Sequence, residues 1–232
     1  MTDYSKTIIK GTSVIFTSTL VTSFIAYLLK IFLARNLSLS EFGLVSSIIS
    51  LFGIFLIFPG AGSGRAVAKL ITEEKTKQNL KGIKTLIKTG FLTNLAISSV
   101  FGLLFIIFSK QIATHYLHDP TTSKYIVIYA IGFILTPTIG IFKSIFIGYK
   151  QSKNYSVVDL IKTLVILILA YIFIKLNMGV MGVILAYVLV YFIPLVLFYP
   201  LFIKKTFPNF HKIKAGIKLE KAKKILSIGI PL

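Results

Sequence analysis

The sequence predicts an all-α, polytopic membrane protein, and three observations support that fold class. Hydrophobic residues make up 55% of the 232 residues and only 14% are charged, against about 25% in a typical soluble domain. The mean hydropathy is +0.86. Uncharged runs long enough to cross about 30 Å of hydrocarbon as helices recur along the chain. This composition excludes a soluble enzyme, a disordered tail and a secreted disulfide scaffold, and the absence of cysteine excludes thiolate metal sites.

The positions of the charges divide the chain into six expected spans. A lipid-exposed backbone must satisfy its own hydrogen bonds, and the runs lack the alternation of barrel strands, so each run is expected to be a helix. The fifth run contains Lys162; the 12 residues 163–174 rise only about 18 Å, so this helix must extend inward past Lys162. The spans are expected at about 11–33, 42–64, 89–109, 125–148, 157–174 and 180–203, forming one bundle over residues 1–203.

Two further segments follow the sixth span. Residues 204–224 are basic and are interrupted by Pro208 and Gly216, which is typical of a cytoplasmic elbow between two helical bundles. Residues 225–232 are apolar and are interpreted as the start of a seventh span that is cut off. We therefore expect the chain to be the N-terminal part of a longer protein or a truncated gene product.

Prolines are expected to kink several spans. They fall inside or at the ends of spans at Pro59, Pro137, Pro194 and Pro200. Each removes a backbone donor and frees a carbonyl of the preceding turn. Kinked helices suit a transporter that rocks open, although they also occur in membrane proteins without that role.

The net charge of +19 predicts the orientation of the chain. The N-terminus and the segments 65–88, 143–162 and 204–224 hold 2, 7, 4 and 8 Lys or Arg, 21 in all, whereas the opposite loops hold 2, 2 and 1, 5 in all. The positive-inside rule then predicts a cytoplasmic N-terminus in the cell membrane. Anionic headgroups account for this charge, so membrane lipids are expected partners and nucleic acid is not.

The segment before the third span has a helical charge pattern. Lys77, Lys81, Lys84 and Lys88 form one stripe beside Leu80, Ile83 and Ile87, which predicts a helix lying at the cytoplasmic interface. Two interpretations remain open: a solvated connector whose lysines snorkel, or a basic ledge that collects an anionic lipid substrate.

Two motifs that suggest cofactors are set aside. The glycines of residues 60–64 follow no strand, so a nucleotide site is rejected and close helix packing is expected instead. His115, His118 and Asp119 lie in an external loop, and two histidines are too few for a metal site. We therefore expect neither a metal nor another cofactor.

Cations at depth are the candidate binding residues. Lys162 and Lys143 are expected below the headgroups, and Lys30 and Arg65 lie nearer span ends. Such residues usually face a bundle interior or a watery cavity, and the alternative is that they snorkel to the interface. Asp159, three residues before Lys162 on the same helix, could pair with it and lower the cost of burying both charges. A cavity with several cations and this single carboxylate nearby favours an anionic ligand such as a phosphate or diphosphate.

One stretch of the chain resembles a known family. Residues 33–43 read LARNLSLSEFG, and a long apolar span and a glycine-rich end follow. This pattern resembles the polysaccharide-biosynthesis flippases of the multidrug/oligosaccharidyl-lipid/polysaccharide exporter superfamily. The end SIGIPL is similar to the start of that family's seventh span. The residues that match the family pattern are Arg35, Glu41, Phe42, Gly43, Gly60, Gly62 and Arg65.

The resemblance implies a transporter rather than an enzyme, because no bond is broken. It implies two lobes around a cationic cavity that move lipid-diphosphate-linked sugars outward, and this chain supplies the N-terminal lobe. The expected contacts to phosphate or sugar are Lys162, Lys143, Lys30 and Arg65, and the second lobe is the expected protein partner. Two alternatives stay open: a cation or drug antiporter of the same superfamily, and an inactive fragment or assembly partner.

Overall fold

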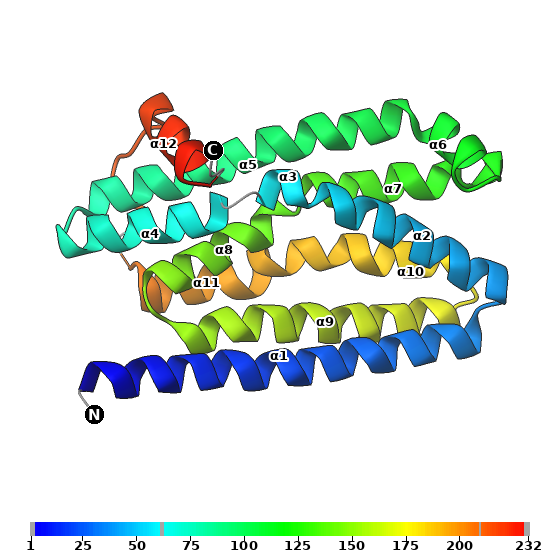
Figure 1. Ribbon diagram of the computed structural model, residues 1–232, viewed down its shortest axis with the longest axis horizontal. Coiled ribbons are helices and arrows are strands. Elements are labelled where there is room, and N and C mark those ends of the chain that lie inside the picture. Colours follow the sequence, from blue (N-terminus) through cyan, green and yellow to red (C-terminus); the bar gives the residue numbers. More distant parts are fainter. Residues whose placement is uncertain (1–2, 61–62, 209, 230–232) are drawn as a thin grey trace.

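The computed structural model describes residues 3–60, 63–208 and 210–229, and it confirms the all-helical prediction for those ranges. The helices run side by side along one long axis (Figure 1). The first six are α1 (Asp3–Asn36), α2 (Leu39–Phe55), α3 (Ile57–Gly60), α4 (Ser63–Thr76), α5 (Leu80–Ile107) and α6 (Ser109–His115). After the 3-10 turn η1 (Pro120–Thr122) come α7 (Ser123–Ile134), α8 (Pro137–Gly148), α9 (Ser152–Lys175) and α10 (Gly179–Leu189). The chain continues through η2 (Val190–Phe192), η3 (Pro194–Phe198), α11 (Tyr199–Leu201), η4 (Phe202–Thr206) and α12 (Leu219–Gly229).

Five segments of the described chain are long and apolar enough to cross a membrane. They are Gly11–Asn36, Leu80–Ile107, Pro120–Gly148, Ser152–Lys175 and Gly179–Lys204, and they overlap five of the six expected spans. The chain is therefore a multi-pass membrane protein. α9 is one unbroken helix that contains Lys162, as the length of residues 163–174 required.

The second expected span, 42–64, is divided into pieces. A reciprocal capping box starts α2, in which the Ser38 backbone N–H donates to Glu41 Oε2 (2.9 Å) and the Glu41 N–H donates to Ser38 Oγ (3.3 Å). α2 ends at Phe55, four residues before Pro59, which is where the proline ring would meet a helical carbonyl. α3 and α4 continue in the same direction (Figure 1), so 17 residues form the only long apolar helix described between Asn36 and Leu80.

Prolines also interrupt the fourth and sixth expected spans. α7 ends at Ile134, and α8 restarts at Pro137 after the hydroxyl of Thr136 has bonded the Phe133 carbonyl (2.8 Å). The π-helical turn η3 begins at Pro194. The kink expected at Pro137 is thus confirmed as a helix break.

The prediction of a separate interfacial helix around residues 77–88 is wrong. α4 ends at Thr76, and the Asn79 side chain caps the start of α5 by accepting from the Gly82 N–H (2.9 Å). Residues 80–88 are therefore the first turns of a long helix. Lys84 is only 6% exposed and its ammonium donates to the backbone carbonyls of Phe210 and of Ile213, the latter at 2.7 Å. The lysine stripe is not a free ledge, because the following chain bonds to part of it.

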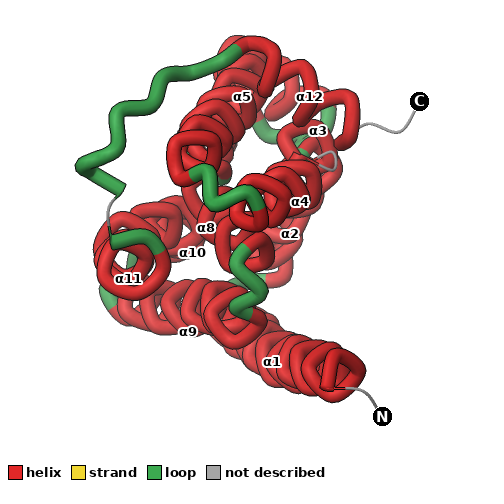
Figure 2. The backbone as a smooth tube through the Cα atoms, turned by 90° about the vertical axis from the view of Figure 1, so that its left-hand side faces the viewer, coloured by secondary structure: helices red, strands yellow, loops and turns green. Residues whose placement is uncertain are grey.

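The elbow lies against α5 and leads into α12. Lys88 donates to the Ala215 carbonyl (3.1 Å), and Figure 2 shows the connecting loop passing from α11 over to α12. α12 starts six residues before the expected position 225, and Ile225 is fully buried among α4 and α5 residues. Residues 230–232 of the expected seventh span, and Gly62 of the family motif, lie outside the described residues.

The described residues form two buried apolar clusters. One is centred on Phe52, Phe105 and Phe133, and the other on Phe142, Phe146 and Ile71. The second cluster joins α4, α5, α8 and α12, at the end of the bundle where the N-terminus and the α4–α5 and α8–α9 connections gather (Figure 1). α1 lies along α9 at the rim (Figure 2), and many of its apolar side chains are exposed.

Candidate polar site at the junction of α1, α4, α8 and α9

The structure brings three of the four predicted cations into one region. Arg65 and Lys143 line one cavity, and Lys162 lines a neighbouring one. Lys30 lines neither of these two cavities; it is exposed on α1, six residues from the opposite end of that helix. The described chain therefore groups Arg65, Lys143 and Lys162 and leaves Lys30 apart.

The first cavity lies between α4 and α8 and has a volume of about 360 Å³. Gly64 and Arg65 come from the first turn of α4, while Gly140, Lys143 and Ser144 lie one helical turn apart on α8. The Ser144 hydroxyl donates to the Gly140 carbonyl (2.9 Å), so its oxygen stays an acceptor. Two cationic side chains make this cavity rich in hydrogen-bond donors.

The second cavity lies between α1 and α9 and has a volume of about 260 Å³. Six of the side chains that line it are serines or threonines, four from α1 and two from α9: Ser18, Thr19, Thr22, Ser23, Ser156 and Thr163. Tyr155, Asp159 and Lys162 complete its polar lining, and Tyr155 also lines the first cavity. The two cavities therefore adjoin.

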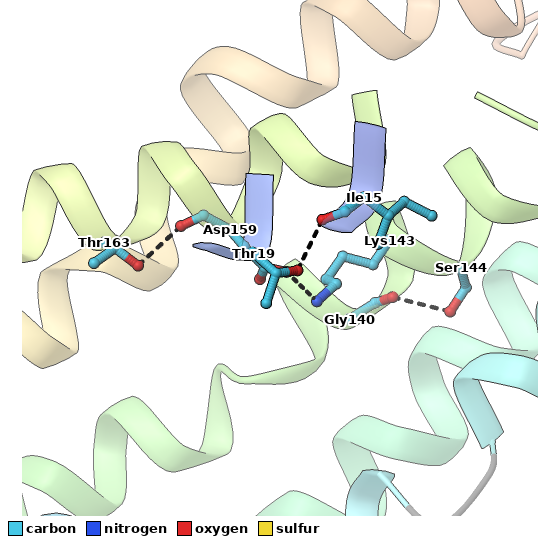
Figure 3. A network of polar contacts seen from close by, with 7 residues as sticks. All are labelled: Ile15, Thr19, Gly140, Lys143, Ser144, Asp159 and Thr163. Atoms are coloured by element: carbon cyan, nitrogen blue, oxygen red, sulfur yellow. Dashed lines mark hydrogen bonds and ion pairs between the residues drawn. The ribbon is translucent and has the colours of Figure 1, made fainter. Parts of the chain in front are cut away.

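An ion pair stands between the cavities. The Lys143 ammonium contacts Asp159 Oδ2 at 2.6 Å (Figure 3). The same ammonium lies 4.7 Å from the ring centre of Tyr155. The pairing of Asp159 with Lys162 is thus not found, because a lysine from the neighbouring helix takes the carboxylate. Lys162 forms no hydrogen bond or ion pair with any described residue.

Two hydroxyl groups in the α1–α9 cavity have no partner. Thr22 Oγ1 and Ser156 Oγ are buried and bond to no described residue, and Ser156 is only 5% exposed. A buried polar group without a partner costs about 1–3 kcal/mol, so a water or ligand that bonded to these hydroxyls would stabilise the site.

The sequence analysis missed these hydroxyl residues, although a signal was present. Ser18 and Thr22, and also Thr19 and Ser23, are four residues apart, which places all four on one side of a helix. A polar side on a membrane-spanning helix is a functional indicator. Serine and threonine interrupt a hydrophobic run far less than charged residues do, so this pattern is harder to recognise in the sequence.

Comparisons with known proteins agree with this fold. The chain is 22% identical over 240 residues to an uncharacterized membrane protein of Methanocaldococcus jannaschii, covering 98% of this chain and 47% of that protein. It also superposes on the outward-facing conformation of a multidrug resistance MATE family transporter of the MOP superfamily, with a TM-score of 0.73 and 18% identity, over 97% of this chain and 51% of that one. The chain thus spans about half the length of each.

A match to a protein-family sequence model assigns the chain to a family. The model described as "Polysaccharide biosynthesis protein" matches residues 8–232, which includes every residue of the two cavities. The match extends over nearly the whole described bundle. The chain therefore belongs to the polysaccharide biosynthesis protein family.

Proposed function

We propose that the chain is the N-terminal lobe of a flippase that moves lipid-diphosphate-linked oligosaccharide or polysaccharide precursors across the cytoplasmic membrane. The observation that carries the proposal is the donor-rich cavity that holds Arg65 and Lys143 beside a hydroxyl-lined one. A diphosphate is an anion that guanidinium and ammonium groups bind well. Family membership and the transporter-like fold support the same function.

The proposed assembly is a two-lobe transporter. Residues 1–203 form one lobe of six crossings, with the interrupted α2–α4 chain as the second crossing. The basic segment 204–224 is the cytoplasmic elbow, and 225–232 starts a seventh span. The lengths of the two compared proteins, about twice that of this chain, support a second lobe as the partner. The N-terminus is cytoplasmic, and the substrate is transported without being cleaved.

Transport by variants tests the proposal. Proteoliposomes that contain the protein and a fluorescent polyprenyl-diphosphate glycan report flipping as loss of fluorescence to an external quencher. Arg65→Ala, Lys143→Ala and Lys162→Ala should each lower the flipping rate at least tenfold with unchanged folding. Lys153→Ala removes an exposed charge from the first turn of α9 and should leave the rate unchanged. Wild-type rates in both Lys143→Ala and Lys162→Ala would contradict the site.

A cation or drug antiporter is the second candidate. Asp159 favours it, because this carboxylate lines the α1–α9 cavity and the structural neighbour is described as a multidrug resistance transporter. An antiporter needs a carboxylate that exchanges protons or cations. The Asp159→Asn variant, argued in the Discussion, distinguishes the two.

A further inference from the structure

Several hydroxyls that line the α1–α9 cavity can offer a ligand only an acceptor. The hydroxyls of Ser18, Thr19 and Thr163 donate to backbone carbonyls of their own helices, at 2.7, 2.9 and 3.0 Å. Their oxygens then have only acceptor capacity left for a ligand. Asp159, when ionised, also only accepts. A ligand that carries its own hydrogen-bond donors can bond to these acceptor oxygens.

A bare phosphate does not fit this chemistry. A phosphate group only accepts hydrogen bonds, and a carboxylate in the cavity repels it. A sugar ring carries several hydroxyls, each of which donates and accepts. It can therefore donate to the oxygens of Thr19, Thr163 and Asp159, and accept from the Lys162 ammonium.

The unpartnered hydroxyls supply the second observation. Thr22 Oγ1 and Ser156 Oγ retain both a donor and an acceptor, and both lie in the lining of this cavity. Ser156 is buried on α9, and Thr22 lies on α1. A cavity of about 260 Å³ holds roughly nine waters at liquid density, which is also space for a single sugar ring.

The position of the cavity relative to the cations fits a sugar joined to a phosphate. Tyr155 lines both cavities, and Lys143 of the first cavity contacts Asp159 of the second. A ligand that extends from one cavity into the other would place its anionic end near Arg65 and Lys143 and its hydroxyls near Thr22 and Ser156.

We propose that the α1–α9 cavity is a sugar subsite that binds the ring next to the diphosphate of a lipid-linked glycan. This inference rests on the proposed function, since that function supplies the lipid diphosphate. The two cavities then bind different parts of the ligand. The α4–α8 cavity binds the phosphate, and the hydroxyls of α1 and α9 bind the sugar.

Binding to two lipids tests the subsite. The chain in lipid nanodiscs is titrated with polyprenyl diphosphate and with polyprenyl-diphosphate-N-acetylglucosamine, which differ only in one sugar. Wild type should bind the sugar-bearing lipid about tenfold more tightly. Thr22→Val combined with Ser156→Ala should abolish that preference without changing the affinity for the sugar-free lipid. Removal of unpartnered buried hydroxyls is neutral or stabilising, so the double variant should fold.

The controls separate this inference from the proposed function. Ser50→Ala removes an exposed hydroxyl on α2 and should keep the preference. Lys143→Ala should weaken the binding of both lipids. If wild type binds both lipids equally, or if the double variant keeps the preference, the sugar subsite is overturned while the phosphate site stands. If neither lipid binds to wild type, the proposed function fails and the subsite with it. A soluble nucleotide sugar that binds as tightly as the lipid-linked one would replace the lipid as the source of the sugar diphosphate.

Discussion

The ion pair of Lys143 with Asp159 makes Lys143 and Lys162 differ in how readily they could bind an anionic ligand. At 2.6 Å the carboxylate occupies one side of the Lys143 ammonium, so an incoming phosphate competes with an internal anion. Lys162 forms no hydrogen bond or ion pair within 4 Å among the described residues. The two lysines therefore differ, because only Lys143 is in direct contact with the carboxylate.

Asp159→Asn should leave phosphate binding intact or tighten it by up to about tenfold, because the variant frees Lys143 from its counter-ion. Flipping of a polyprenyl-diphosphate glycan by this variant should stay near the wild-type rate, because the asparagine amide oxygen can still accept a hydrogen bond from a sugar hydroxyl. The measurement is lipid binding in nanodiscs together with flipping in proteoliposomes. Complete loss of transport with intact folding would favour the antiporter. Asp119→Asn, in an exposed loop, is the matched control.

The extension of α9 past Lys162 was predictable from the sequence, but the partner of Asp159 was not. The extension follows from arithmetic on one helix, because 12 residues cannot cross the hydrocarbon. The partner depends on how α8 packs against α9, and spacing along one helix carries no information on that. Lys84 shows the same limit: its periodicity is helical, yet the carbonyls of Phe210 and Ile213, more than 120 residues away, decide its role.

At the scale of elements, α4 and α8 approach each other closely at Gly148. A Cβ there would lie 2.7 Å from a methyl group of Ile71 and 3.0 Å from the Ala68 carbonyl oxygen. The Thr72 hydroxyl also contacts the Gly148 carbonyl at 3.0 Å. The arrangement of Arg65 beside Lys143 depends on this contact, because each residue lies on one of the two helices.

Gly148→Ala should lower the stability of the protein by about 1–3 kcal/mol, since the added methyl group has to displace backbone as well as Ile71. Thermal unfolding in detergent measures the change. Gly53→Ala on α2 is the control, because a Cβ there meets nothing within 4 Å and alanine favours a helix. Equal melting temperatures for the two variants would contradict the close approach.

α12 is held to α4 by a charged contact. The Lys221 ammonium lies 2.8 Å from Glu74 Oε1, and the Asn79 amide donates to the other oxygen at 2.6 Å. The hydrogen bond from Lys221 outweighs burial and holds the pKa of Glu74 below its usual value of 4.5. This contact therefore stabilises the fold fully above pH 4.5, and the stabilisation is lost as the pH falls through the lower folded pKa.

Acidification should therefore loosen α12. Amide hydrogen exchange of residues 219–229, corrected for intrinsic rates, should show protection that is constant from pH 7 to pH 5 and decreases below 4.5. Glu74→Gln should give the loosened helix at neutral pH and no further change on acidification. Constant protection of α12 in wild type down to pH 3 would refute a role for this ion pair.

The helix boundaries show which elements a sequence predicts well. Prolines predicted the breaks at Phe55 and before Pro137, because their effect on the preceding turn is local. The start of α5 at Leu80 was missed, since a polar, lysine-rich turn was interpreted as outside the membrane-spanning helix. Its burial against the elbow is a tertiary effect.

At the scale of the whole molecule, the charge distribution and the fold agree. The N-terminus and the α4–α5 and α8–α9 connections gather at one end of the bundle, and the α1–α2, α6 and α9–α10 connections lie at the other (Figure 1). A bundle with such asymmetry is expected to insert with its basic end toward the cytoplasm. The cations Arg65 and Lys143 of the proposed phosphate site would then be reached from the cytoplasmic side.

Single-cysteine labelling should report this orientation without background, because the natural chain contains no cysteine. Lys75→Cys, Lys150→Cys and Lys212→Cys place exposed thiols at the basic end, and Lys110→Cys and His118→Cys place them at the other. A membrane-impermeant maleimide added to intact cells should label only the second group, and permeabilised cells should label all five. The reverse pattern would overturn the proposed orientation. Labelling of both groups in intact cells would contradict the multi-span arrangement itself, since one face of a membrane cannot present both ends of the same bundle.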